Sequence, residues 1–321
     1  MSETLSSLTP LCVARRSAIA RGIHAFELRN ADGAPLPAFT AGAHVTVQTP
    51  AGLPRKYSLC NDPRERDRYL IAVKREPTGR GGSASLVDDC DAGSVLPCSV
   101  PHNDFALADK AREFLFIAGG IGITPIVAMV HHLRSSGGPR FSLYYLTRSP
   151  EETAFRDALA SEPAAGRVVI HHDGGDPARS FDLWPLFERP RPVHVYACGP
   201  RGLLQSIRDM TGHWPASSIH VESFADAGTL AVADDRPFRV RLARSGDVVD
   251  VGAKQSILDA LRDHGLDVPS SCESGTCGTC RTRLVAGEAD HRDLVLTDAE
   301  HADTIMVCVS RARSQEIVID R

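Results

Sequence analysis

The 321-residue chain lacks a long uninterrupted apolar segment. The longest stretch without a charged residue runs from Phe114 to Val130, and three glycines and Pro125 interrupt it, so it does not resemble a membrane-spanning helix. Arg15 and Arg16 are not followed by an apolar block, so no secretory signal is indicated. We therefore expect a cytoplasmic protein that does not enter a membrane.

A marked excess of charge of either sign is also absent. The chain carries 36 Lys and Arg against 40 Asp and Glu, a net charge of −4. No strong basic field is available for nucleic acid or anionic lipid, so neither is expected as a partner. Apolar residues make up 42% and charged residues 24%, which is ordinary for globular domains and excludes a disordered or fibrous chain.

Three stretches of the sequence differ in pattern and predict three domains. Up to about residue 105, short alternating runs such as 44–48 and 69–73 are separated by turns, which is typical of an antiparallel barrel. From about residue 112 to 224, apolar strands alternate with helical stretches, which indicates a parallel sheet covered on both faces. The strands expected there are Phe114–Ala118, Phe141–Leu146, Val168–His171 and Val193–Ala197, and the helices are Ile126–Leu133, Glu152–Ala160 and Leu203–Met210.

A small, polar segment, Ala225–Arg236, predicts a linker before a third, α+β domain. We place the three domains at residues 1–108, 109–226 and 235–321. The elements expected in the third are the strands Phe238–Ala243, Val248–Val251, Arg281–Val285, Ile305–Val309 and Glu316–Ile319, and the helix Ser256–His264.

Four of the nine cysteines follow a metal-binding pattern. Cys272, Cys277 and Cys280 are separated by four and then two residues, and Cys308 follows after 27 more. This spacing matches plant-type [2Fe–2S] ferredoxins, in which four thiolates hold two irons. A zinc site is the alternative, but four-thiolate zinc sites usually combine two Cys-x2-Cys pairs, and only one is present. The sequence therefore favours an iron–sulfur cluster.

Motifs outside the cysteine loop extend this pattern into a family resemblance. Residues 55–59 are Arg-Lys-Tyr-Ser-Leu, residues 119–125 are Gly-Gly-Ile-Gly-Ile-Thr-Pro, and residues 198–200 are Cys-Gly-Pro. In this order, and followed by the cysteine loop, they resemble the phthalate dioxygenase reductase and vanillate demethylase reductase family. The resemblance implies an antiparallel β-barrel that binds flavin, an α/β parallel-sheet domain that binds NAD, and a β-grasp ferredoxin domain of the plant type.

Two segments of the barrel are candidates for a flavin site. Arg55 offers a rigid donor fork suited to a phosphate, and the Gly81-Gly82-Ser83 turn opens a helix whose N–H groups form an anion site. The Tyr57 ring can lie along an isoalloxazine, and Ser58 can hydrogen-bond near flavin N5. An ordinary surface strand is the alternative.

The family resemblance completes the set of expected flavin contacts. It adds Lys56 and the strand residues Val73, Lys74 and Arg75, which border the flavin in the family. It favours FMN over FAD, although both occur with the Arg-x-Tyr-Ser pattern.

Two glycine-rich turns are candidates for a nicotinamide site. Gly120 and Gly122 lie where a strand passes into a helix, so a pyrophosphate can approach the backbone. Cys198, Gly199 and Pro200 end another expected strand at the same sheet edge, where ligands bind in open α/β folds. A ligand-free strand–turn–helix is the alternative.

The resemblance assigns roles to side chains around these turns. It implies that Thr124 and Cys198 flank the nicotinamide, and that Phe224 covers the flavin until the nicotinamide displaces it. Both Cys198 and Phe224 could instead be plain core side chains.

Nucleotide preference depends on residues at two strand ends. Asp173 could accept a ribose hydroxyl and repel a 2′-phosphate, whereas Arg148 could attract that phosphate. Asp173 and the resemblance favour NADH.

These observations predict an NADH-dependent reductase. The resemblance implies that electrons pass from NADH through FMN and a [2Fe–2S] cluster to a terminal Rieske-type aromatic oxygenase or demethylase. The expected catalytic residues are Ser58, Thr124, Cys198 and Phe224. The alternatives are the reductase of another monooxygenase system and a non-enzymatic flavin/iron–sulfur redox sensor.

Overall fold

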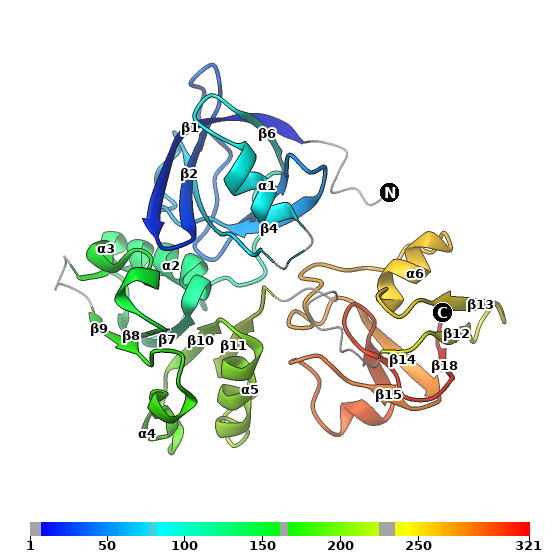
Figure 1. Cartoon of the computed structure of the whole chain (residues 1–321). Helices are drawn as coiled ribbons and strands as arrows, with labels where there is room; N and C mark the ends of the chain where they lie inside the picture. The colour runs from blue at the N-terminus through cyan, green and yellow to red at the C-terminus, as the bar shows by residue number, and fades with distance from the viewer. Residues whose placement is uncertain (1–7, 78, 80, 161–165, 225–234) are drawn as a thin grey trace. The chain divides into compact units, whose positions relative to one another are not determined.

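The computed structural model describes residues 8–77, 79, 81–160, 166–224 and 235–321, and the chain divides into two compact units (Figure 1). The first unit is Met1–Val221 and the second is Glu222–Arg321. The expected linker lies outside the described residues except for its last two, Asp235 and Arg236.

An antiparallel sheet, in the order β4-β3-β6-β1-β2-β5, forms the N-terminal part of the first unit. Its two end strands also meet, because Leu59 bridges to Ile71 and Cys60 N donates to Leu70 O at 2.7 Å. The sheet therefore closes on itself, and the predicted barrel is confirmed. Its elements are β1 (Thr9–Ala20), β2 (Ile23–Arg29), β3 (His44–Gln48), β4 (Pro54–Ser58), β5 (Tyr69–Lys74), α1 (Gly82–Asp89) and β6 (Val95–Cys98).

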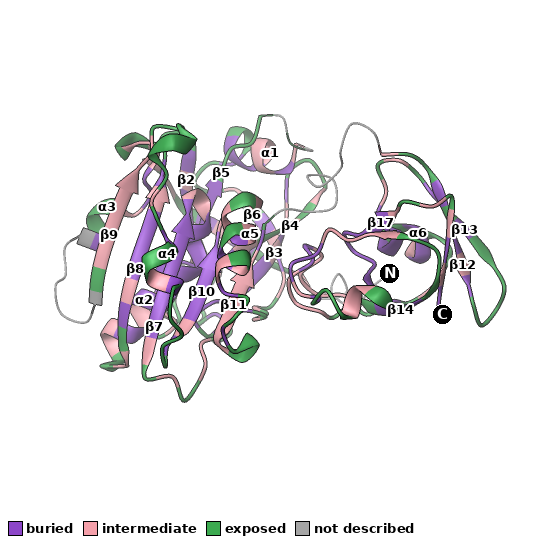
Figure 2. Cartoon of the chain, turned by 90° about the horizontal axis from the view of Figure 1, so that it is seen from below, coloured by how far each residue is buried: buried purple, intermediate pink, exposed green. Residues whose placement is uncertain are grey.

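A parallel sheet, in the order β11-β10-β7-β8-β9, forms the rest of the first unit. Strand β7 pairs in parallel with β8 and β10, and these central strands are largely buried (Figure 2). The predicted α/β domain is thus confirmed. Its elements are β7 (Glu113–Gly119), η2 (Gly120–Gly122), α2 (Ile123–Ser136), β8 (Arg140–Thr147), η3 (Pro150–Glu152), α3 (Arg156–Ala160), β9 (Gly166–His172), η4 (Pro177–Arg179), α4 (Trp184–Phe187), β10 (His194–Cys198), α5 (Arg201–Met210), η5 (Ala216–Ser218) and β11 (Ile219–Glu222).

The helix expected over Glu152–Ala160 is wrong in its first half. A short 3-10 turn covers Pro150–Glu152, and α3 begins only at Arg156. Phe155 has a φ of 58°, a left-handed conformation that an α-helix cannot contain, so the helical spacing there did not produce a helix.

One apolar core joins the barrel to the parallel sheet. Ile126 and Met129 of α2 are fully buried, in the same cluster as Ile23 and Ala72 of the barrel and Phe116 of the sheet. The barrel and the sheet therefore make one compact unit. The boundary expected at residues 108 and 109 falls between β6 and β7 and stays a prediction.

The second unit contains a mixed sheet, in the order β13-β12-β18-β14-β16, a two-stranded sheet β15-β17 and the helix α6. Strands β12 and β18 are parallel, and the other pairs are antiparallel. The Ser256 hydroxyl caps the helix by accepting the Asp259 N–H at 3.0 Å. The elements are β12 (Phe238–Leu242), β13 (Val248–Val251), α6 (Ile257–Asp263), β14 (Arg281–Ala286), β15 (Ala289–Asp290), η6 (Glu300–Ala302), β16 (Thr304–Met306), β17 (Arg311–Ala312) and β18 (Glu316–Ile319).

The strand expected over Ile305–Val309 is shorter than predicted. It ends at Met306, because the N–H groups of Val309 and Ser310 turn back to the Met306 carbonyl at 3.3 and 3.0 Å. This turn carries Cys308. Among the described helices, none is long and apolar enough to cross a membrane.

Candidate functional site

The four predicted cluster ligands lie in two segments of the second unit. Cys272, Cys277 and Cys280 belong to the loop between α6 and β14, and Cys308 lies in the turn after β16. The Cys272 sulfur accepts three backbone N–H groups at 3.3–3.4 Å, and the Cys272 N–H points to the Cys277 sulfur at 3.4 Å. Such donors stabilise thiolates and tune the potential of a cluster. The three donors to Cys272 are Ser274, Thr276 and Cys277.

The four thiols also interact with one another. A hydrogen bond with the Cys277 thiol lowers the pKa of Cys272 to about 4, and the same bond raises the pKa of Cys277. A bond between Cys280 and Cys308 likewise lowers the pKa of Cys280 and raises that of Cys308. Cys272 also acts electrostatically on Cys280 and Cys308, so the two pairs are close together. The donor set fits a four-thiolate cluster.

The cysteine loop uses left-handed backbone at three positions. Gly275 and Gly278 have φ values of 76° and 83°, as glycine readily allows, but Glu273 also has a φ of 55°. The Glu273 carboxylate accepts from Arg262 at 2.9 Å and from the Ser270 hydroxyl at 2.9 Å, which holds this strained residue in place. The role of Arg262 was not predicted, because no sequence pattern links this helix residue to the cysteine loop.

Arg55 and the glycine turn meet, as the flavin hypothesis requires. A Cβ added to Gly82 would lie 2.9 Å from Arg55 Nε, so the guanidinium stem lies directly over the start of α1. Gly81 precedes that helix with a φ of 89°, and no described side chain caps the helix. The Ser83 hydroxyl accepts the Glu76 N–H at 3.1 Å and so closes this turn.

Tyr57, two residues after Arg55 on β4, has a buried hydroxyl. Burial raises its pKa to about 12, and its oxygen has no hydrogen-bond partner within the described part of the chain. Ser58 is also buried and lies opposite His44 in the β3–β4 pairing. Lys56 is exposed on the same strand. A polar ligand would satisfy the Tyr57 hydroxyl, so these residues fit a flavin.

The predicted flavin contacts on β5 and directly after it differ in burial and in their partners. The Val73 side chain is buried in the barrel core, so only its backbone can face a ligand. Lys74 forms an ion pair with Glu76 at 2.8 Å. Arg75 forms a bidentate ion pair with Asp88 of α1, with N–O distances of 2.9 and 2.7 Å. These ion pairs tie β5 to the turn and helix at the candidate phosphate site.

The two turns of the candidate nucleotide site touch through their backbones. A Cβ on Gly122 would lie 2.2 Å from the Cys198 carbonyl oxygen, and one on Gly119 would lie 2.6 Å from Pro200. A Cβ on Gly199 would lie 2.9 Å from the Gly119 backbone. Because η2 also lies against β5, the candidate flavin and nucleotide segments meet inside the first unit.

The side chains expected around the nicotinamide differ in exposure. The buried Thr124 hydroxyl donates to the Ile121 carbonyl at 3.0 Å. Cys198 has no exposed surface and belongs to the core shared by the barrel and the parallel sheet. This burial agrees with the alternative that Cys198 is a core side chain. Phe224 follows β11 and is 44% exposed. Their contacts with a nicotinamide stay predictions.

Asp173 and Arg148, the two residues expected to influence nucleotide preference, lie in neighbouring loops. The Asp173 N–H donates to the Thr147 carbonyl at 3.2 Å, and the Gly174 N–H donates to the Arg148 carbonyl at 2.9 Å. One Asp173 carboxylate oxygen accepts the Gly175 N–H at 2.7 Å, within the loop that follows β9. Both loops stand at the carboxyl edge of the sheet, where nucleotides bind.

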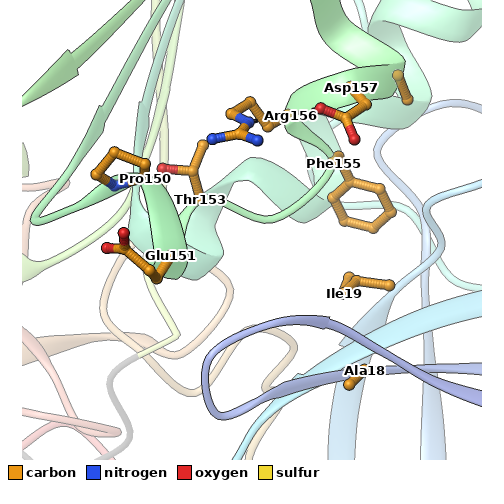
Figure 3. Close-up of a pocket in the computed structure, with 9 residues that line it drawn as sticks. Ala18, Ile19, Pro150, Glu151, Thr153, Phe155, Arg156 and Asp157 are labelled. Atoms are coloured by element: carbon orange, nitrogen blue, oxygen red, sulfur yellow. Dashed lines mark hydrogen bonds and ion pairs between the residues drawn. The ribbon is translucent and has the colours of Figure 1, made fainter.

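A separate pocket of about 480 Å³ lies between β1 and the segment around η3 and α3 (Figure 3). In the picture, the Phe155 ring points toward Ile19 of β1, and Glu151 lies at the other side of the pocket. None of the predicted flavin or nucleotide residues lines it, so it supports neither assignment.

Comparisons with known proteins agree with the sequence motifs. Residues 240–313 match the family described as 2Fe-2S iron-sulfur cluster binding domain. The chain is 55% identical to the phthalate 4,5-dioxygenase oxygenase reductase subunit of Pseudomonas putida, over 99% of both chains. It is 54% identical to the phthalate dioxygenase reductase of Burkholderia cepacia, over 97% of this chain and 96% of that protein. A vanillate O-demethylase oxidoreductase of Pseudomonas putida is 40% identical over 96% and 98% of the two chains.

A solved structure of a phthalate dioxygenase reductase has the same fold. It covers 98% of both chains with a TM-score of 0.76 and 52% identity, and is described as a modular structure for electron transfer from pyridine nucleotides to [2Fe-2S]. The protein is therefore an oxidoreductase, the pyridine-nucleotide-dependent reductase component of an oxygenase system with a [2Fe–2S] ferredoxin domain. It belongs to the phthalate dioxygenase reductase and vanillate demethylase reductase family. The predicted fold class, enzyme class and family are confirmed.

Proposed function

We propose that this chain passes electrons from NADH, through FMN and a [2Fe–2S] cluster, to a terminal Rieske-type aromatic oxygenase. The observation that carries the proposal is the cysteine loop, in which three N–H groups point to one thiol and four thiols act on one another. That arrangement suits an electron carrier, because the donors stabilise added negative charge.

The protein's part in the reaction is to position two cofactors and a nucleotide. When bound, the flavin accepts a hydride and the cluster carries single electrons onward. Arg55 and the start of α1 would hold the FMN phosphate, while Tyr57 and Ser58 would orient the ring. The turns at Gly120–Gly122 and Cys198–Pro200 would seat the nicotinamide beside it. Cys272, Cys277, Cys280 and Cys308 would ligate the cluster.

Phthalate-type dioxygenases are the proposed partners. The relatives named for phthalate dioxygenases are 54–55% identical to this chain over nearly their whole length, whereas the vanillate oxidoreductase is 40% identical. Docking surfaces diverge with the partner, so the higher identity favours the phthalate type.

Reconstitution tests this assignment. The purified holoprotein should reduce the Rieske centre of a phthalate-type dioxygenase with NADH, and should do so faster than that of a vanillate demethylase. Flavin released by denaturation should migrate as FMN. A protein without iron, or one that binds FAD, would contradict the cofactor assignment, and equal rates with both oxygenases would contradict the partner.

A further inference from the structure

A group of two histidines and one aspartate in the second unit has no part in the proposed electron path. His291 Nδ1, Asp293 Oδ1 and His301 Nε2 lie within 4.8 Å of one another. The carboxylate oxygen is 4.0 Å from each of the two nitrogens. The imidazole rings stack with their centroids 4.0 Å apart and their planes 18° from parallel. Three potential ligand atoms therefore lie close together, and one imidazole must turn out of the stack before both nitrogen lone pairs, which lie in the ring planes, can meet one ion.

The convergent atoms are buried. The side chain of Asp293 has no exposed surface, and those of His291 and His301 are only 15% and 27% exposed. Neither His291 Nδ1 nor His301 Nε2 has a hydrogen-bond partner among the described residues. A buried polar atom without a partner costs free energy, so two of them facing one carboxylate require a physical reason. A bound cation would supply one.

Neighbouring groups orient these side chains as the outer groups of a metal site do. The second carboxylate oxygen of Asp293 accepts the N–H groups of Val295 and Leu296 at 3.1 and 2.7 Å, which turns Oδ1 toward the histidines. On the far side of its ring, His301 Nδ1 lies 3.9 Å from an Asp298 oxygen. That distance is longer than a hydrogen bond, so the exposed Asp298 carboxylate lies behind the imidazole without fixing its tautomer.

We propose that His291, Asp293 and His301 form a binding site for a divalent transition-metal ion of the zinc type. Two imidazoles and one carboxylate are a donor set that zinc uses, with water in the fourth position. Ligand atoms around a tetrahedral zinc lie about 3.4 Å apart, so each carboxylate–imidazole separation must close by about 0.6 Å. The partly exposed His301 has room for that movement.

The proposed site lies against the cysteine loop. Leu294 N–H donates to the Gly275 carbonyl at 2.8 Å, and a Cβ on Gly275 would lie 3.0 Å from Asp293 Cα. Because a nearby cation stabilises the more negative, reduced form of a cluster, bound zinc should raise its midpoint potential. This coupling rests on the proposed function.

Zinc titration of the untagged holoprotein tests the site. Iron is counted first, and the protein is then dialysed against zinc chloride. We expect one zinc per chain in addition to two irons. X-ray absorption at the zinc edge should show nitrogen and oxygen neighbours at about 2.0–2.1 Å and no sulfur near 2.3 Å. His291→Gln and His301→Gln should each weaken zinc binding at least tenfold, and His264→Gln, a half-exposed histidine of the same unit, should not.

Each outcome bears on a different part of the proposal. Undiminished zinc binding in both variants with unchanged cluster spectra, or sulfur neighbours around zinc, would overturn the site. A midpoint potential that zinc leaves unchanged, although zinc binds, would overturn the coupling alone. Failure of the proposed function would appear earlier, as missing iron before any zinc is added. Asp293 is left intact because it also caps the Val295–Leu296 backbone.

Discussion

At the scale of single residues, the thiols of the cysteine loop are distinguished from the other cysteines by what surrounds them. Cys60 and Cys98 are also buried, but burial raises the pKa of Cys98 to about 12 and that of Cys60 further, so both remain inert thiols. Cys272 is surrounded by N–H donors that favour the thiolate. Local N–H donors therefore distinguish Cys272 from the buried thiols of the barrel.

Replacement of Cys308 tests the ligand set. We expect Cys308→Ser to lose the cluster, because three thiolates remain, while the flavin stays bound to the first unit. Iron, labile sulfide and flavin per chain are the measurements. Cys12→Ser, in β1 of the barrel, is the matched control and should keep all three. A fully loaded cluster in Cys308→Ser would remove Cys308 from the ligand set.

Replacement of Asp173 tests nucleotide preference. We expect Asp173→Ala to reduce discrimination against NADPH by about 1–2 kcal/mol, the scale of a lost hydrogen bond to a charged group. The ratio of kcat/KM for NADH and NADPH should then change by roughly 5- to 30-fold. Asp176→Ala is the control, since Asp176 caps a similar turn by accepting the Ala178 N–H. An unchanged ratio of kcat/KM values in Asp173→Ala would show that this carboxylate does not determine the preference between NADH and NADPH.

At the scale of elements, the junction between β7 and β10 is sensitive to one added methyl group. We expect Gly122→Ala to cost about 1–3 kcal/mol, because its Cβ would meet backbone atoms of Cys198 and Gly199 that cannot move independently of the sheet. The melting temperature of the first unit and NADH oxidation with ferricyanide should both fall. Gly212→Ala, whose Cβ has no neighbour closer than 3.9 Å, should change neither. Normal stability in Gly122→Ala would mean that the two turns separate easily.

The barrel should lose stability in mild acid because of His44 on β3. Burial lowers the pKa of His44 to about 4, against an ordinary value of 6.5. Between these values the unfolded chain binds a proton that the folded chain does not, so stability falls by about 1.4 kcal/mol per pH unit as the pH decreases. His44→Gln should reduce the slope of unfolding free energy against pH from 6.5 to 4. An identical slope in the variant would show that His44 charges freely in the fold.

Some helices and strands could be predicted from the sequence, and others could not. Period-two and helical patterns located β3 and β5 of the barrel, β7 to β10 of the parallel sheet and helix α6, because those patterns reflect one buried face, but they did not locate β1, β2 or β6. The patterns failed at Phe155 and after Met306, where local backbone turns end an element although the residues remain apolar. They also gave no sign of the His291–His301 group, because its members meet only through the folded loop.

In the candidate site, too, some features could be predicted from the sequence and others could not. Cysteine spacing and the glycine turns are local signals, and they identified the segments that the fold brings together. The placement of Arg55 over Gly82 and of Arg262 on Glu273 depends on tertiary contacts, which no local pattern reports. Sequence alone therefore predicted segments that meet in the fold, and the structure added how their side chains are held.

At the scale of the whole molecule, the division into Met1–Val221 and Glu222–Arg321 separates most of the candidate flavin and nucleotide residues from the candidate cluster ligands, although Phe224 falls in the second unit. Arg55, Tyr57, Thr124 and Cys198 belong to the first unit, and all four candidate cluster ligands belong to the second. Each unit has its own apolar core. Hydride transfer and one-electron delivery should therefore be separable by cutting the chain.

Truncation after Ala233 tests this separation. We expect the shortened chain to fold, to bind FMN and to oxidise NADH with ferricyanide, because it keeps the barrel, the parallel sheet and their shared core. It should not support turnover by the oxygenase, because Cys272, Cys277, Cys280 and Cys308 are removed. The measurements are flavin content, ferricyanide reduction and oxygenase turnover, for the full-length and shortened proteins at several salt concentrations.

The control for this experiment is full-length Cys308→Ser, which keeps the second unit but should lose the cluster. If the cluster is the obligatory carrier, both proteins should reduce ferricyanide and neither should drive the oxygenase. If the second unit served only for docking, the shortened chain would fail while Cys308→Ser retained turnover. Turnover by the shortened chain at undiminished rate would mean that electrons leave directly from the flavin, and the proposed order of carriers would be wrong. The salt series adds a test of docking, since contacts between exposed charges weaken as ionic strength rises.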